Sequence, residues 1–380
     1  MRLTRLLAAG TVAATLLTGA VVLQAPPAVA AVTDGAIFNN PTVAAEQYKI
    51  RDHIRSLIQG TPAGATIRVT IYHFTNTSVS DDLIAAKNRG VSVKVVVDRS
   101  HGGQAPVTAL KSALGENRGA ASWVHVCTDA ACIGTKNTPI MHNKFFLFSS
   151  TGGASNVVVQ ASANLTTDNA TKYWNNAVTL VGNANLYNGF AGYFDDLAYQ
   201  RHTNDYYTTV SSGNAKAYYF PRAGTGPSTD TIYNALDENV TCQGNTSVGT
   251  ETGRTIIRIG MWTFGREEIA QKLRELANQK CWVEVIYTEM YPAVRAALAN
   301  HDRIVLYHVP DPWVIHSKYM LIEGTYAGQK DTKWVFTGSH NYTTSALREN
   351  DETLLRIKSA AIHDQFRANF RTIRAMAEAG

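Results

Sequence analysis

Two stretches of the chain share one order of apolar and polar positions. Residues 67–98 and 257–288 align at a constant offset of 190. Each has an apolar segment ending in Phe74 or Phe264, a segment with apolar residues at helical spacing, and a second apolar segment. The second segments, VSVKVVV and CWVEVIY, alternate apolar and polar side chains as strands do. The middle segments suit helices packed on a sheet. Each stretch therefore predicts a β-α-β unit with parallel strands.

Each β-α-β unit is followed by the same pair of short motifs. An apolar segment carries His-x-Lys, and a turn carries Ser-x-Asn, in ASANLT at 161–166 and in GSHNYT at 338–343. The two histidines, His142 and His316, are 174 residues apart, and the two serines are 177 apart. Because four features recur in one order, we predict an α/β protein made of two homologous halves.

The halves are expected at residues 31–200 and 256–380. Between them, residues 201–255 form a connector rich in Tyr, Gly, Ser and Thr. The chain has 380 residues, of which 45% are hydrophobic and 17% charged, so it can bury a substantial core.

Residues 1–30 are expected to be a cleaved signal peptide. Arg2 and Arg5 precede an uncharged apolar stretch that ends in Ala-Val-Ala at 28–30, which is the layout of a secretory signal. We therefore expect a secreted, soluble protein. The formal net charge is +5, and removing this segment with its two arginines leaves +3. That mild charge, without a Lys/Arg-rich cluster, is weak evidence against a nucleic-acid substrate.

The four cysteines favour disulfide bonds, because an even number in an exported chain is typical of them. Cys127 and Cys132 are close enough for a small loop, which leaves Cys242 with Cys281. Sequence alone permits three pairings, and this one is preferred. A zinc site is the alternative, but no Cys-x-x-Cys pair with a His at ligand spacing accompanies them.

The His-x-Lys motifs suit the chemistry of a phosphodiester. Residues i and i+2 of a strand face one side, so His142 points with Lys144, and His316 with Lys318. If the halves meet at one cleft, the lysines neutralise the phosphate oxygens, one His attacks phosphorus, and the other protonates the leaving oxygen. The lysines supply the positive charge that a metal would otherwise give, so no metal or cofactor is expected. Ser162, Asn164, Ser339 and Asn341 would add neutral hydrogen-bonding groups that bind the phosphate.

With these motifs the chain resembles the phospholipase D superfamily, whose signature is His-x-Lys-x4-Asp followed by Gly-Ser-x-Asn, present twice. The likeness runs from about residue 45 to about residue 375. It implies two mixed α/β sheets packed with pseudo-twofold symmetry, with the site at their interface. It also implies a phosphohistidine intermediate that water or an alcohol resolves. Matched by position, the catalytic residues would be His142, Lys144, His316 and Lys318.

The sequence departs from this signature at several positions. The signature acid is Ser149 in the first half and Glu323 in the second, and the glycine before the first serine is Ala161. Family members often carry a further acid after Ser-x-Asn. The second half offers Glu352, with Asp351 beside it, whereas the first half offers only Asn175, Asn176 and Ala177.

Two interpretations of the missing acids remain open. One is decay into a protein that only binds phosphorylated ligands. The other is a division of labour, in which Glu352 and Glu323 are supporting acids of the second half. Glu352 would raise the pKa of His316, making it the general acid, and His142 would stay neutral and attack phosphorus. The superfamily's use of the N-terminal His as the nucleophile favours the same assignment.

The favoured substrate is a phospholipid at a membrane surface, hydrolysed or transferred to an alcohol by a monomeric enzyme. Aromatic residues near the motifs suit a membrane interface, although core packing explains them equally well: Tyr173, Trp174, Tyr291 and Trp313. A nuclease of the same superfamily is the alternative enzyme. Such small nucleases usually carry one motif per chain and dimerise, which counts against it.

Overall fold

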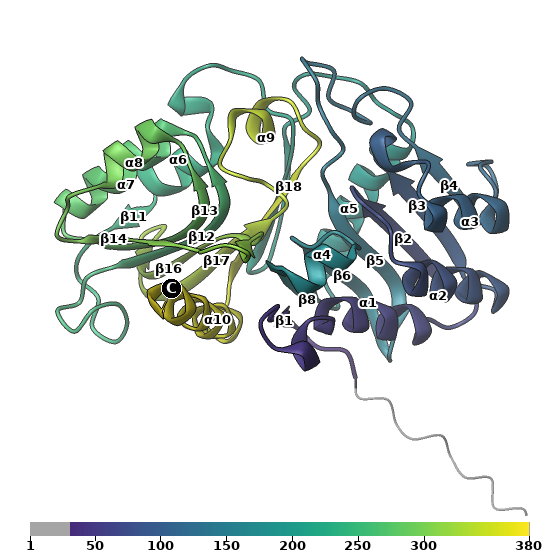
Figure 1. Ribbon diagram of the computed structural model, residues 1–380, viewed down its shortest axis with the longest axis horizontal. Helices are drawn as coiled ribbons and strands as arrows, with labels where there is room; N and C mark the ends of the chain where they lie inside the picture. Colours follow the sequence, from purple (N-terminus) through teal and green to yellow (C-terminus); the bar gives the residue numbers. More distant parts are fainter. Residues whose placement is uncertain (1–30, 380) are drawn as a thin grey trace, which may run out of the picture. The chain divides into compact units, whose positions relative to one another are not determined.

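The computed structural model describes residues 31–379, so the expected signal peptide at 1–30 lies outside the described residues. Residues from Ala31 onward form one compact unit. It contains two mixed sheets, one from each half of the chain, as the sequence predicts (Figure 1). No helix in the described part is long and apolar enough to cross a membrane.

The first sheet has seven strands in the order β1-β8-β6-β5-β2-β3-β4. Strands β2, β3 and β4 are mutually parallel, and the others join antiparallel. The strands are β1 (Gly35–Phe38), β2 (Thr66–Ile71), β3 (Ser92–Val97), β4 (Trp123–Val126), β5 (Lys144–Thr151), β6 (Ala154–Ala161) and β8 (Asn176–Leu180). The helices are α1 (Lys49–Gln59), α2 (Thr77–Asn88), α3 (Ala105–Leu114), α4 (Thr167–Thr171) and α5 (Ala184–Ala198).

The second sheet has nine strands, eight of them in the order β14-β13-β12-β16-β17-β18-β10-β9, with β11 paired to β16. The strands are β9 (Thr208–Ser212), β10 (Ala215–Tyr219), β11 (Val240–Thr241), β12 (Ile256–Phe264), β13 (Trp282–Met290), β14 (Ile304–His308), β16 (Lys318–Tyr326), β17 (Gln329–Gly338) and β18 (Thr353–Lys358). The helices are α6 (Thr231–Asp237), α7 (Glu267–Asn278), α8 (Pro292–Leu298), α9 (Thr344–Arg348) and α10 (Ala360–Ala379).

Both β-α-β units form as the apolar pattern predicts. Strand β2 pairs in parallel with β3, and β12 pairs in parallel with β13. The first-half strand ends at Ile71, earlier than expected, and Phe74 makes only an isolated bridge to Leu165. The segment 201–255 carries β9, β10, α6 and β11, of which β10 extends the second sheet by pairing with β18.

The inner faces of the two sheets share one core. Its buried residues come from the first sheet (Phe145, Val178), from α5 (Phe190) and from the second sheet (Leu321, Leu355). Trp174 belongs to this core, so the membrane interpretation was wrong for that residue. Helices α1, α2 and α3 cover the outer face of the first sheet, and α6, α7 and α8 cover that of the second.

Helix α10 also bridges the halves. Its Gln365 accepts a hydrogen bond from the Ala36 N–H of β1 at 2.8 Å, and Phe366 packs edge-on against Phe38 at 4.9 Å between ring centroids. The halves therefore fold as one body.

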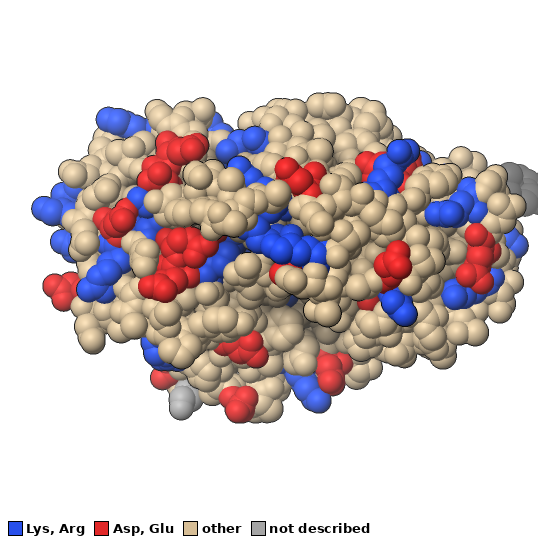
Figure 2. Space-filling model, turned by 90° about the horizontal axis from the view of Figure 1, so that it is seen from above, with Lys and Arg blue, Asp and Glu red and all other residues tan. Residues whose placement is uncertain are grey.

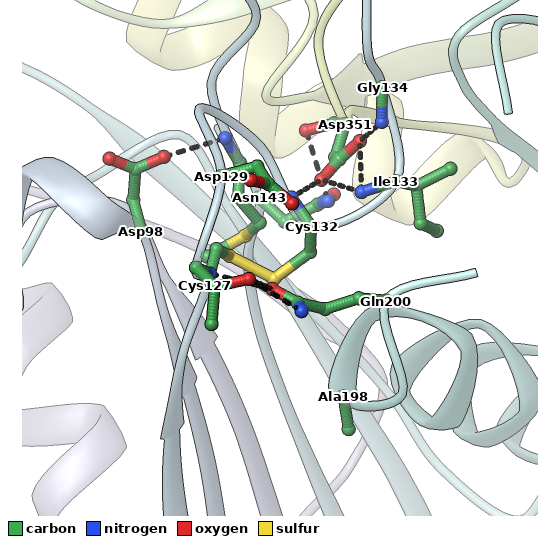
Figure 3. The surroundings of a disulfide bond; sticks show 12 residues. Asp98, Cys127, Asp129, Cys132, Ile133, Gly134, Asn143, Ala198, Gln200 and Asp351 are labelled. Atoms are coloured by element: carbon green, nitrogen blue, oxygen red, sulfur yellow. Dashed lines mark hydrogen bonds between the residues drawn. A yellow bond between two sulfur atoms is a disulfide. The ribbon is translucent and has the colours of Figure 1, made fainter. Parts of the chain in front are cut away.

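The preferred disulfide pairing is confirmed. Cys127 bonds to Cys132, and Cys242 bonds to Cys281. Beside the first bond, the Asp351 carboxylate of the second half accepts backbone hydrogen bonds from Cys132 at 2.8 Å, Ile133 at 3.1 Å and Gly134 at 2.8 Å (Figure 3). The small disulfide loop of one half is thereby held against the other half.

Candidate active site

The histidines of the two His-x-Lys motifs meet at one cavity of about 470 Å³ between the halves. His142 and His316 both line it, together with Asn164. Each lysine opens its strand, Lys144 in β5 and Lys318 in β16, and each His lies just before that strand. All four motif side chains are buried. The sequence prediction that the halves contribute equivalent residues to one place agrees with this geometry.

Backbone pairings join the two halves at two equivalent positions. Met141 forms a parallel bridge with Asp351, and β15 (Val314–Ile315) pairs in parallel with β7 (Tyr173–Trp174). The His142 N–H donates to the Asp351 carbonyl at 3.0 Å, and the His316 N–H donates to the Trp174 carbonyl at 2.9 Å. Each His is therefore held by the segment that follows Ser-x-Asn in the opposite half.

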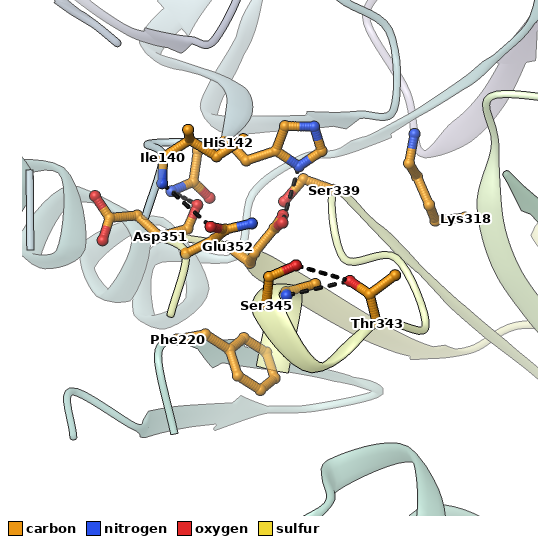
Figure 4. Close-up of polar contacts among 12 residues, drawn as sticks. Ile140, His142, Phe220, Lys318, Ser339, Thr343, Ser345, Asp351 and Glu352 are labelled. Atoms are coloured by element: carbon orange, nitrogen blue, oxygen red, sulfur yellow. Dashed lines mark hydrogen bonds and ion pairs between the residues drawn. The ribbon is translucent and has the colours of Figure 1, made fainter. Parts of the chain in front are cut away.

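Because of these pairings between the halves, the partner of Glu352 differs from the expected one. The carboxylate was expected to support His316, in its own half, but its Oε1 lies 2.8 Å from Nδ1 of His142 (Figure 4). Glu352 is fully buried. The expectation was wrong because it placed each supporting acid in the half that encodes it. His142, which the sequence left without a carboxylate, has one.

The residue behind His316 is Asn175. Nδ1 of His316 lies 2.9 Å from Oδ1 of Asn175, which also accepts a hydrogen bond from the Ser162 hydroxyl at 2.9 Å. Nδ2 of Asn175 donates to the backbone carbonyls of Asn169 at 2.9 Å and Tyr173 at 3.3 Å. With the amide nitrogen committed to carbonyls, the oxygen must face the imidazole.

Burial dominates the electrostatics of the four motif groups. It lowers the pKa of His142 to about 4, although Glu352 raises it in part, and it lowers the pKa of Lys144 to about 7. The pKa values of His316 and Lys318 also fall well below their usual values, first through burial and then through the neighbouring lysines. Positive charge on these four buried groups is therefore costly unless an anion lies beside them.

Each lysine lies over an aromatic ring that the sequence analysis did not select. The ammonium of Lys144 is 5.2 Å from the centroid of Tyr72, and that of Lys318 is 5.1 Å from Trp262. The same rings lie 5.2 Å from His142 and 4.8 Å from His316. Tyr72 and Trp262 are 190 residues apart, so the offset of the repeat itself was the signal that could have found them.

A buried acid in the first half was also missed. Asp98 follows β3, and its Oδ2 accepts the Met141 N–H at 2.7 Å. The equivalent residue in the second half is Thr288, whose hydroxyl accepts the Ile315 N–H at 2.8 Å. In both halves a side chain thus accepts the backbone N–H of the residue before the His, but only in the first half is that side chain a carboxylate. Burial raises the pKa of Asp98.

The Ser-x-Asn residues divide into structural and cavity-facing groups. Ser162 and Ser339 accept the backbone N–H groups of Asn176 at 3.0 Å and Thr353 at 3.1 Å, and so fix the strands that follow. Asn164 lines the cavity, and its Oδ1 accepts the His73 N–H at 3.3 Å. Oδ1 of Asn341 is buried and has no hydrogen-bond partner within the described residues.

Glu323 contacts neither motif His, contrary to the expectation that it is a supporting acid. Its carboxylate accepts hydrogen bonds from Arg258 at 2.9 Å and Arg367 at 3.0 Å. These contacts, the Arg258 hydrogen bond above all, lower the pKa of Glu323 in spite of its burial. Ser149, the equivalent position of the first half, accepts the Thr66 N–H at 2.8 Å. The signature acid position is therefore a packing position between strands.

Comparison with known proteins agrees with this geometry. The family model described as cardiolipin synthase, phospholipase D-like domain, matches residues 55–198 and 251–374. Since these ranges make up well over half of the chain, the protein belongs to this family of the phospholipase D superfamily, whose members are phosphoryl-transferring enzymes. A comparison with curated protein sequences finds no significant match.

Two solved structures, a kinase and a synthase, share the fold at low sequence identity. A polyphosphate kinase from Porphyromonas gingivalis superposes with a TM-score of 0.58 at 14% identity, over 90% of this chain and 50% of the kinase. A phosphatidylserine synthase from Haemophilus influenzae gives 0.56 at 12% identity, over 90% of this chain and 85% of the synthase. The phospholipase D family member Nuc from Salmonella typhimurium covers 44% of this chain at 26% identity with a TM-score of 0.33. This chain spans half the length of the kinase.

Proposed function

We propose that the protein is a phosphodiesterase of phospholipase D type that forms a phosphohistidine on His142. One observation carries this proposal. Two buried imidazoles from opposite halves line one cavity, and only His142 is bound to a carboxylate, Glu352, at 2.8 Å. The imidazole ring of a phosphohistidine carries a positive charge that persists between two chemical steps, so the His with a carboxylate is the better site for it.

The roles of the other groups follow from their positions. Lys144 and Lys318 would hold the non-bridging oxygens and neutralise the charge that develops on them. Nε2 of His142 would form a bond to phosphorus as the P–O bond to the leaving group breaks, and the leaving oxygen would keep the electron pair of that bond as an anion. His316 would then take a proton from water, or from an alcohol, as that oxygen attacks phosphorus. The bond to His142 would break and return its electron pair to the imidazole.

Lipid phosphodiesters are the substrate class we favour. The matching family model and a structural neighbour are named for enzymes of phospholipids, cardiolipin synthase and phosphatidylserine synthase. The cavity is also lined by Tyr72, Tyr173 and Trp262, and Tyr291 of the second half is 52% exposed. On the face in Figure 2, basic side chains are interleaved with acidic ones, which suits a long nucleic acid less well.

Product analysis tests the proposal. Protein lacking residues 1–30 is incubated with mixed phospholipids plus ethanol, and separately with single-stranded and duplex DNA, all in EDTA. We expect phosphatidylethanol and phosphatidic acid to form, slowly where the released headgroup is an aliphatic alcohol, with no loss of rate from the chelator. The matched inactive control is His142→Ala. DNA cleavage alone would establish a nuclease, and folded protein without either activity would leave a binding protein; both outcomes contradict the proposal.

We also propose that the protein is secreted and monomeric. The arginines and apolar stretch of residues 1–30 support export, as do the two disulfide bonds, which persist in oxidising compartments. Expression of the full chain should release a product beginning near residue 31, which N-terminal sequencing of the medium would identify. Full-length protein retained in the cell would contradict export, and a dimer by light scattering would contradict the monomer.

A further inference from the structure

The amide of Asn175 is held in one orientation by a buried network. The backbone N–H of Asn175 donates to Oδ1 of Asn39 at 2.8 Å, and Nδ2 of Asn39 donates to the backbone carbonyl of Tyr173 at 2.8 Å. Asn175 and Asn39 are both almost fully buried. If the Asn175 amide turned over, its nitrogen would face the Ser162 hydroxyl and His316 while its oxygen faced two carbonyls. The oxygen therefore stays beside His316 as a hydrogen-bond acceptor.

This orientation fixes the tautomer of His316. Since Oδ1 of Asn175 only accepts, Nδ1 of His316 carries the proton, and in the neutral ring Nε2 keeps its lone pair. His316 also lines the cavity. A neutral imidazole in this state is ready to accept a proton. To act as an acid, it must first become an imidazolium.

The surroundings of His316 disfavour that second proton. Burial lowers its pKa most, followed by Lys318 of β16, Lys144 of β5 and His142. The rings packed on it, Tyr173 and Trp262, are uncharged aromatics. The carboxylate that could stabilise an imidazolium, Glu352, is bound to His142. His316 is thus suited to accept a proton. To act as an acid it would need a nearby negative charge to stabilise its imidazolium form, and it lacks one.

We propose that the natural substrate of this site carries an acidic leaving group, a phenol or a phosphate, rather than an aliphatic alcohol such as choline. This rests on the function proposed above. Nε2 of His142 bonds to phosphorus as the P–O bond breaks, and the electron pair leaves on an oxygen stable as a phenolate or phosphate, which needs no proton from His316. An alkoxide is far more basic and would need that proton in the transition state.

A leaving-group series in the wild-type protein is the first test. Diesters with one common ethyl phosphoryl part and p-nitrophenol, phenol or choline as the leaving group are compared, together with a nucleoside diphosphate ester whose leaving group is a phosphate. We expect the aryl and phosphate leaving groups to be released at least about 10²-fold faster than choline, the range that general acid catalysis spans. Equal rates for choline and p-nitrophenol would overturn the proposal. Whichever of the aryl and phosphate arms is faster identifies the natural class.

Asn175→Asp gives the second test. A carboxylate there should raise the choline ester rate by about 10-fold or more and leave the p-nitrophenyl ester rate within about 3-fold. It should also move the alkaline limb of the pH profile for the choline ester upward by about one pH unit or more, because the new charge favours the imidazolium. If the cleavage rates of both esters changed by the same factor and the alkaline limb of the pH profile did not shift, Asn175 would have only a structural role.

Matched variants separate folding defects from the proposed effect. Asn176→Asp places the same charge one residue on, at a side chain that donates to the Thr337 hydroxyl at 2.8 Å. It should not change the ratio of the two esters, whatever it does to the melting temperature. If no ester is cleaved at all, the proposed function fails. If all are cleaved with a flat leaving-group dependence, only the inference about the leaving group fails.

Discussion

At the scale of single residues, the two motif histidines differ in the charge of the side chain behind each of them. His142 is bound to a carboxylate oxygen of Glu352 and His316 to an amide oxygen of Asn175. Both contacts fix the tautomer of the ring, but only the carboxylate stabilises a positive imidazole. The difference matters because both imidazoles and both motif lysines are buried, so there is little solvent around them to compensate for a missing charge.

Replacing Glu352 with Gln should impair phosphoenzyme formation. The amide keeps the hydrogen bond to His142 and loses the charge, so we expect kcat/KM to fall by about 10²-fold, in the range for removal of one transition-state stabiliser. The measurement is the burst of p-nitrophenol from an activated diester under single-turnover conditions. A burst as fast as in the wild type would contradict the assigned role of the carboxylate.

Glu323→Gln is the matched control, because Glu323 is also a buried glutamate but contacts Arg258 and Arg367 instead of a motif His. Removing one partner of a buried ion pair typically costs about 3–5 kcal/mol. We expect a clear loss of stability in chemical denaturation and a burst close to that of the wild type. The two variants should therefore separate stability from catalysis.

The sequence could identify the motif residues but not their partners. Identical spacing in two halves pointed to His142, Lys144, His316 and Lys318, and Glu352 was recognised as an acid of interest. Its assignment to His316 was wrong because Glu352 and His142 are 210 residues apart in the sequence. They come together only because the segments around them pair between the two halves. No periodicity within either half carries that information.

At the scale of elements, the short disulfide loop acts as a brace for the site. The Asp351 side chain holds the loop through the N–H groups of residues 132–134, while its backbone carbonyl accepts the His142 N–H at 3.0 Å. The position of His142 therefore depends on a contact between a loop of the first half and a turn of the second.

Gly134→Ala should disturb this brace. A Cβ at Gly134 would lie 2.0 Å from the Glu349 carbonyl, so the loop or the turn must move. We expect a loss of about 2–3 kcal/mol in the free energy of unfolding, as for overpacked sites, together with reduced activity. Gly103→Ala is the control, since no atom lies within 4 Å of a Cβ there, and it should change neither quantity. Wild-type stability and activity in the Gly134 variant would show that the loop adjusts freely.

The elements themselves were largely predictable. Strands β3 and β13 and helices α2 and α7 lie where alternation and helical spacing put them, because each buries one face against a sheet. The strands within 201–255 were not expected, because β10 pairs with β18, more than 130 residues later, and its short apolar run sits among turn residues. Pairing over such a separation leaves no local signal.

At the scale of the whole molecule, the shared core buries many imidazoles in neutral form. Burial lowers the pKa of His142 and His363 to about 4, and that of His316 and His340 well below the usual value. Unfolding frees them to bind protons near pH 6.5. The unfolded state thus binds more protons, and stability falls as the pH decreases.

We therefore expect the free energy of unfolding to decline from about pH 6.5 to about pH 4. Buried Asp98 and Asp351 oppose this trend, because burial raises their pKa values, that of Asp351 to about 7, but they are outnumbered. Urea denaturation at several pH values measures the slope, and His363→Gln, outside the cavity, should flatten it. A stability that is constant or rises on acidification over this window would contradict the expectation.

The pairing of each His with a segment of the opposite half also has a consequence for the symmetry of the site. If two identical copies of one half were paired in the same way, each His would meet the same partner, and the site would be symmetric. Joining both copies in one polypeptide frees each to change alone, so Asn175 could appear behind one His while Glu352 remained behind the other. Two unequally supported histidines are therefore a property that a single polypeptide can have and a symmetric homodimer of one half cannot.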